Sequence, residues 1–90
     1  MTWKIELLAE AERTLKKLDP PVERRIYAFL FLRLARLDNP RSIGEALHGK
    51  KLGEFWKYRV GDYRILARIE DNILRILVVK VGHRREVYER

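Results

Sequence analysis

Cysteine is absent from this 90-residue sequence, and histidine occurs only at His48 and His83. Without thiols the chain can form neither disulfides nor a thiolate metal site, and a reducing compartment is permitted. Two histidines far apart in sequence do not make a zinc-binding pattern. We therefore expect neither a metal nor a cofactor.

Long hydrophobic runs are also absent. The longest apolar stretch, IYAFLFL at residues 26–32, is bounded by arginines and is far shorter than the ~20 residues that cross a bilayer. The first residues, MTWKIELLAEAER, place Lys4, Glu6 and Glu10 where a signal peptide requires an apolar core. We expect a cytoplasmic protein with no membrane association.

Positive charge is concentrated in the C-terminal half of the chain. The net charge is +7, and hydrophobic residues make up 47%, as in ordinary globular proteins. Residues 1–45 hold 9 Lys and Arg against 7 Asp and Glu, whereas residues 46–90 hold 11 against 6. This asymmetry favours a polyanionic partner, nucleic acid first and an acidic protein second. A basic surface that only maintains solubility is the alternative.

A chain of 90 residues organises a single hydrophobic core, so we expect one domain over residues 1–90. The hydrophobic spacing predicts that this domain has an α+β fold. Alternating apolar residues predict a strand at residues 3–7, and helical spacing predicts a short helix at 9–18. Pro20 and Pro21 suit the first turn of a second helix, which runs to about residue 37.

Three strand-like runs follow: FWKYRV, YRILARI and ILRILVVKV. Gly61-Asp62 separates the first two and Asp71-Asn72 the last two, and both pairs suit two-residue hairpin turns. The element order β-α-α-β-β-β predicts a helical hairpin packed on one face of a small, mostly antiparallel sheet.

The first of these turns predicts a pairing of like charges. It places Arg59 opposite Arg64, an arrangement that destabilises a sheet by roughly 0.2–1 kcal/mol. A phosphate between the two guanidinium groups would replace repulsion with charge-assisted hydrogen bonds. The alternative is that these arginines are solvated and their stems cover apolar residues. The cationic side of the ribbon is predicted to carry Lys57, Arg59, Arg64 and Arg68.

The second turn extends this cationic side to the last strand. A two-residue turn at Asp71-Asn72 predicts that Arg75 lies opposite Arg68. Leu66, Leu77 and Val79 would share the face. We therefore expect a shallow groove with an apolar floor and a cationic wall.

The C-terminal stretch KVGHRREVY is expected to leave the sheet beside the Gly61 turn, which brings His83, Arg84, Arg85 and Tyr88 near the same anion. Such a set could cleave RNA without metal. A base removes the 2′-hydroxyl proton, cations stabilise the pentacoordinate phosphate, and an acid protonates the leaving 5′-oxygen. An imidazole suits proton transfer near neutral pH, whereas Tyr88 serves as base only where cations stabilise its phenolate.

Each of these residues also has a purely structural interpretation. His83 could be a surface residue near a strand end, and Tyr88 a core aromatic that anchors the C-terminus. His48 is expected in a loop, where Lys50 and Lys51 could join it in touching a nucleic-acid backbone.

The stretches LHGKKLGEFWKYRVGDYRIL and VGHRREVY resemble the RelE family of the RelE/ParE toxin superfamily, and the resemblance extends over essentially the whole chain. It implies a toxin of a type II toxin–antitoxin system that cleaves mRNA on the ribosome and inhibits translation. The implied partners are a cognate antitoxin, the ribosome and mRNA. A homodimer and a toxin–antitoxin heterotetramer are both open.

The resemblance also assigns roles by position. Lys57 and Arg64 match cationic active-site positions, Arg84 matches an arginine implicated in phosphate stabilisation or proton transfer, and Tyr88 matches the terminal tyrosine discussed as base. His83 stands where family members differ. Our candidate catalytic residues are Lys57, Arg64, His83, Arg84 and Tyr88, and our candidate RNA-binding residues are His48, Lys50, Lys51, Arg59, Arg68 and Arg85.

Two further features bear on the family comparison. The chain stops soon after Tyr88, without the terminal helix of longer members. The second helix carries Tyr27, Phe31 and Leu32 beyond its core stripe. We expect these three residues either to contact antitoxin or a second copy of the chain, or to be covered by the loops and first strand.

Two other functions fit the same scaffold. One is inhibition of DNA gyrase by a ParE-like toxin, against which WKYRVGDYR and the final tyrosine weigh. The other is a basic RNA- or protein-binding module without turnover.

Overall fold

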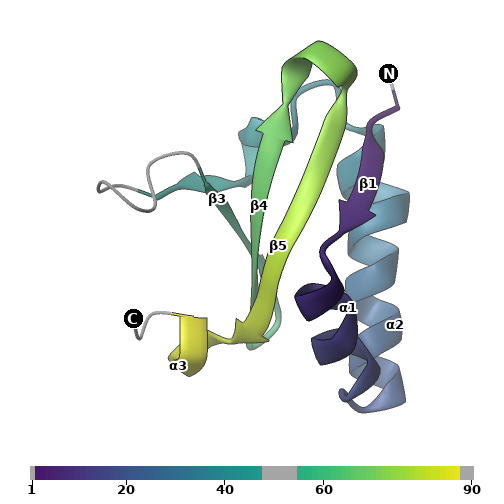
Figure 1. Ribbon diagram of the computed structural model, residues 1–90, viewed down its shortest axis with the longest axis vertical. Coiled ribbons are helices and arrows are strands. Elements are labelled where there is room, and N and C mark those ends of the chain that lie inside the picture. The colour runs from purple at the N-terminus through teal and green to yellow at the C-terminus, as the bar shows by residue number, and fades with distance from the viewer. Residues whose placement is uncertain (1, 48–54, 88–90) are drawn as a thin grey trace.

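The computed structural model describes residues 2–47 and 55–87. A five-stranded sheet, in the order β1-β5-β4-β3-β2, carries helices α1 and α2 on one side (Figure 1). β1 pairs in parallel with β5, and every other described pair is antiparallel. The predicted α+β fold is therefore confirmed. The strands are β1 (Lys4–Leu7), β2 (Glu45–Ala46), β3 (Trp56–Val60), β4 (Tyr63–Glu70) and β5 (Arg75–His83).

Both helices lie where the sequence predicted them, and the prolines stand at the start of the second. α1 (Ala9–Lys16) has acidic residues in its first turn and basic residues in its last, which matches the helix dipole. α2 (Pro20–Ala28) begins with two prolines and continues through a π turn, η1 (Phe29–Arg33), and a 3-10 turn, η2 (Leu34–Arg36). None of the helices in the described ranges is long and apolar enough to cross a membrane.

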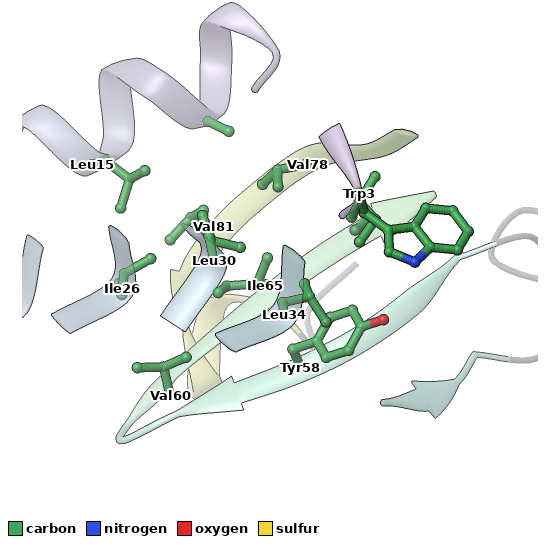
Figure 2. Packing of buried hydrophobic residues seen from close by; sticks show 13 residues of the cluster. Trp3, Leu15, Ile26, Leu30, Leu34, Tyr58, Val60, Ile65, Val78 and Val81 are labelled. Carbon is green, nitrogen blue, oxygen red and sulfur yellow. The ribbon is translucent and has the colours of Figure 1, made fainter. Parts of the chain in front are cut away.

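One hydrophobic core lies between the helices and the sheet. Ile26, Leu30 and Leu34 are fully buried, as their spacing predicts. They point toward strand residues such as Ile65 and Val78 (Figure 2). Because side chains alternate along a strand, these contacts fix which residues of β4 and β5 must face the other side of the sheet.

The outer surface of the second helix remains apolar. Leu32 is 60% exposed and Phe31 is 43% exposed. The Tyr27 and Phe31 rings stack with their centroids 6.1 Å apart. The interpretation that loops and the first strand cover these residues is wrong for Phe31 and Leu32.

The second long hairpin differs from the prediction. β4 and β5 are joined by η4 (Asp71–Ile73) and by Leu74, which takes a left-handed conformation with φ 50°. This longer connection shifts the register, so Arg75 pairs with Glu70 and not with Arg68. The predicted two-residue turn and the Arg68–Arg75 pair are both wrong.

A β-bulge changes the two faces of β5. Ala67 pairs with Val78 and Leu66 pairs with Lys80, which leaves Val79 as an extra residue in β5. An extra residue reverses the alternation of side chains beyond it. Lys80 therefore shares the face of Leu66, whereas an unbroken strand would have directed it toward the core.

A buried hydrogen bond ties the loop after the second helix to the sheet. The Tyr58 hydroxyl donates to the Pro40 carbonyl oxygen over 2.7 Å. Burial raises the pKa of Tyr58 to about 12, so the hydroxyl stays protonated and donates at any physiological pH.

Replacing Tyr58 with phenylalanine should remove this buried hydrogen bond between the sheet and the loop. We expect Tyr58→Phe to lower the free energy of unfolding by about 1–2 kcal/mol, measured as a lower urea midpoint with an unchanged slope. Tyr27→Phe is the matched control, because among the described residues the Tyr27 hydroxyl has no hydrogen bond. Equal midpoints for the two variants would contradict this account.

Candidate functional site

The first hairpin has the predicted register. Arg59 lies opposite Arg64, and Lys57 lies opposite Leu66. Gly61 occupies the turn with φ 59°, a conformation that glycine adopts without a steric penalty. The two arginines are therefore neighbours on the face of the sheet that points away from the helices.

Arg64 is buried although it carries a charge. Its side chain is 5% exposed, and its Nη1 donates to the carbonyl oxygens of Gly61, at 3.1 Å, and Tyr63, at 3.0 Å. Its Nε is buried without a hydrogen-bond partner, and no carboxylate among the described residues pairs with the guanidinium. A buried charge without a counter-ion is costly. This position therefore favours an anion.

The C-terminal segment returns to the same turn. Gly82 pairs with Arg64, and the Arg84 backbone N–H donates to the Asp62 carbonyl oxygen over 2.8 Å. A single helical turn, α3 (Arg84–Val87), starts there (Figure 1). Arg84 and Arg85 are exposed. Residues 82–84 therefore lie beside the Gly61 turn as expected, and a short helix follows where we expected none.

His83 does not join this group of cations. It pairs with Tyr63, and the two rings meet edge to face with centroids 5.6 Å apart. Tyr63 packs against the hydrophobic core, so both rings lie on the face of the sheet opposite to Arg64. The extra residue at Val79 causes this placement. The expectation that His83 reaches the same anion as Arg64 is not met.

Lys57 is directed toward the edge of the sheet. Its side chain is 7% exposed, and its Nζ lies 3.1 Å from Oε1 of the exposed Glu45 in β2. Leu66 separates it from Lys80 across the sheet. Lys57 therefore shares the face of Arg64 and has an acidic partner of its own.

The remaining candidates are divided between described and undescribed parts of the chain. Arg68 is exposed on the cationic face and lies near Glu70, whose pKa its charge helps to lower. Four candidates lie outside the described residues: His48, Lys50, Lys51 and Tyr88.

Carboxylates compensate the cations at the far end of the sheet. Arg75 contacts Glu70 and donates to Glu6 over 2.9 Å, and Arg41 donates twice to Asp71, over 3.0 and 2.7 Å. These hydrogen bonds hold the pKa values of Glu70 and Asp71 below their ordinary range. Four cations lie near the Gly61 turn: Arg59, Arg64, Lys80 and Arg84. Within the described ranges, none of them is paired with a carboxylate.

Two cations near the turn were not predicted from the sequence. Lys80 reaches the face of Arg64 because of the bulge. An unbroken strand would have buried this lysine, so its charge was the one sequence signal that pointed to a bulge. Arg25 comes from α2, and its Nη1 lies 3.0 Å from where a Cβ on Gly61 would stand. No local pattern could have indicated a contact between helix and turn.

Comparison with known proteins identifies the chain as a toxin of the RelE/ParE superfamily of type II toxin–antitoxin systems. A family model described as the ParE toxin of the type II system parDE matches residues 5–88. The chain therefore belongs to the ParE toxin family. It is 32% identical to Toxin RelG of Mycobacterium tuberculosis over 90 residues, which are 100% of both chains.

Solved structures agree with this assignment. The toxin–antitoxin complex RelBE2 from Mycobacterium tuberculosis contains a chain that is 29% identical, with a TM-score of 0.84 and 92% of each chain covered. The RelE–RelB complex from Pyrococcus horikoshii shares the fold at 24% identity and a TM-score of 0.75, covering 93% of this chain and 97% of that one. The resemblance to the RelE/ParE superfamily is therefore confirmed.

The Gly61 turn should tolerate asparagine better than alanine. Alanine in a left-handed conformation costs about 1–2 kcal/mol, whereas asparagine adopts it more readily. We expect Gly61→Ala to lower the free energy of unfolding by about that amount and Gly61→Asn by less, measured by urea denaturation. Both variants add a Cβ near Arg25, so their difference isolates the backbone conformation. Equal stability would show that the turn relaxes to another geometry.

Proposed function

We propose that this toxin is a metal-independent endoribonuclease that cleaves ribosome-bound mRNA and thereby inhibits translation. The observation that carries the proposal is the buried guanidinium of Arg64, which has no carboxylate partner within the described ranges. Arg59 lies opposite it and Arg84 starts the segment beside the same turn. A phosphodiester is an anion whose geometry suits arginine donors.

The proposed chemistry is attack of an RNA 2′-hydroxyl on the adjacent phosphate. A base takes the 2′-hydroxyl proton, the P–O5′ bond breaks, and an acid returns a proton to the 5′-oxygen. In the proposal Arg64 and Arg84 stabilise the additional negative charge on the pentacoordinate phosphate. Lys57 contributes further positive charge, and Tyr88 is the proposed base. His83 is a weaker candidate, because its ring packs against Tyr63 on the other face.

The proposed partners are the ribosome, mRNA and a cognate antitoxin. Two structural relatives were solved as toxin–antitoxin complexes, which supports the antitoxin. Exposed Phe31 and Leu32 offer an apolar surface for the antitoxin or for a second copy of the chain. A homodimer and a toxin–antitoxin heterotetramer stay predictions, as does a cytoplasmic location.

Removing Arg84 should abolish most of the proposed activity without unfolding the protein, because this residue is exposed. We expect Arg84→Ala to reduce translation-dependent mRNA cleavage by about 100-fold or more, since a donor that stabilises transition-state charge has an effect of that order. The measurement is mapping of mRNA 3′ ends in a translating extract. Arg36→Ala, an exposed arginine in η2, is the control for lost surface charge.

Arg64 and Tyr88 complete the same experiment. Arg64→Lys keeps the charge but not the bidentate geometry, and we expect cleavage to fall substantially while the protein stays folded. Tyr88→Phe should be inactive if the phenolate is the base. Cleavage at the wild-type rate in both Arg64→Lys and Arg84→Ala would refute the proposed site.

Inhibition of DNA gyrase is the second candidate function, and the match to the ParE toxin model favours it. It predicts loss of supercoiling by purified gyrase and intact mRNA in the translating extract. A non-catalytic module would instead bind RNA in a salt-sensitive manner and leave both substrates unchanged. The two assays together separate all three functions.

A further inference from the structure

A stripe of three residues on the second helix faces the edge of the sheet at β3. Arg25, Phe29 and Arg33 are spaced four residues apart, so they lie on one side of the continuous α2–η1 helix. Arg25 lies against the Gly61 turn. The Phe29 ring is tilted against Tyr58 of β3, with centroids 5.9 Å apart. Phe29 and Arg33 line a cleft between the helix and β3.

This cleft combines some apolar surface with positive charge that has no acidic partner among the described residues. It has a volume of about 360 Å³, which is within the usual range for small-molecule sites. Phe29 and Ile43 provide apolar surface, and the exposed cations are Arg33 from η1 and Arg59 from β3. Within the described ranges neither arginine has an acidic partner.

One carboxylate also lines the cleft, and it is already engaged. Glu45 lies 3.1 Å from the Lys57 ammonium, so its charge is compensated within the cleft wall. β2 pairs with β3 only at Trp56 and Lys57 in the described ladder, which leaves Arg59 beyond the end of β2. The net charge of the cleft lining is therefore positive and is provided by Arg33 and Arg59.

The cleft is continuous with the proposed reaction site through Arg59. Arg59 lines the cleft and lies directly opposite Arg64 in the sheet. Directly opposite residues in an antiparallel pair have their Cβ atoms roughly 4.5–5.5 Å apart, less than the distance between consecutive phosphates of an extended nucleic-acid strand. Arg59 therefore connects the cleft lining to the position proposed for the reacting phosphate at Arg64.

We propose that this cleft binds one nucleotide of the RNA strand next to the cleaved position. The phosphate lies between Arg33 and Arg59, and the base stacks on Phe29. Arginines beside an aromatic ring are the combination that proteins use for single-stranded nucleic acid, because every base has a flat face and every nucleotide an anion. An acidic peptide would use the arginines but has less need of the ring. The inference rests on the proposed function for its substrate.

Direct binding of RNA tests the cleft independently of cleavage. The probe is a fluorescent single-stranded RNA of about eight nucleotides, 2′-O-methylated throughout to prevent reaction, titrated with the toxin at several salt concentrations. One lost phosphate contact reduces the slope of log affinity against log salt by about 0.7 for a single strand. We expect this change for Arg33→Ala, together with at least fivefold weaker binding. Arg36→Ala removes the same charge three residues away, outside the cleft lining, and should change the slope much less.

Phe29→Leu tests the stacking component. It keeps apolar volume beside Tyr58 and removes the ring, so we expect at least fivefold weaker binding with an unchanged salt slope. A thermal unfolding curve checks that this partly buried position stays folded. Arg33→Ala, at an exposed residue, remains decisive if Phe29→Leu does not fold.

Three outcomes would overturn the inference: equal salt slopes for Arg33→Ala and Arg36→Ala, wild-type RNA affinity in Arg33→Ala, or Arg33→Ala weakening the binding of a glutamate-rich peptide while RNA binding is unchanged. The last would identify a protein-binding cleft. The cleavage assay separates this inference from the proposed function. If the toxin cleaves, Arg33→Ala should raise the half-saturating ribosome concentration and leave the maximal rate unchanged. If the toxin cleaves no mRNA, the proposed function is wrong. The oligonucleotide titration still tests whether the cleft binds RNA.

Discussion

The pairing of Arg59 with Arg64 across β3 and β4 is the constraint on which the site depends. Two guanidinium groups side by side repel each other, and one of them is buried. The sheet cannot relieve this by slipping one residue, because the slip would move Ile65 and Tyr58 from the core into solvent. The hydrophobic contacts on one face of the ribbon thus hold an unfavourable arrangement of charge on the other.

The cations at the two ends of the sheet differ in whether carboxylates pair with them. Near the β4–β5 connection, Arg75 and Arg41 are matched by Glu70, Glu6 and Asp71, so these cations stabilise the fold. Near the Gly61 turn the described cations lack such partners. The arginines that stabilise the fold and those proposed to bind an anion therefore differ in their acidic neighbours within the described ranges.

The sequence predicted the features that depend on local chemistry. The Gly61-Asp62 turn specified the register of its hairpin, and the spacing of Ile26, Leu30 and Leu34 specified the buried side of the second helix. It failed where tertiary packing decided the geometry. The left-handed residue after η4 is Leu74, and leucine is not a residue that predicts a turn. The bulge at Val79 has only one sequence signal, which is that an unbroken strand would direct the charged Lys80 into the core. These two features moved Arg75 and His83 from their predicted places and brought Lys80 to the face of Arg64.

The chemistry of arginine limits how the charge at the Gly61 turn can be relieved. A buried lysine can lose its proton and become neutral, whereas an arginine in a protein stays protonated. Within the described ranges, the hydrogen bonds of Arg64 Nη1 go only to the backbone carbonyl oxygens of Gly61 and Tyr63. A bound anion that reaches Arg64 removes a penalty that the folded chain cannot remove by itself. This gives any such anion a binding advantage that an exposed arginine, already hydrated, would not supply.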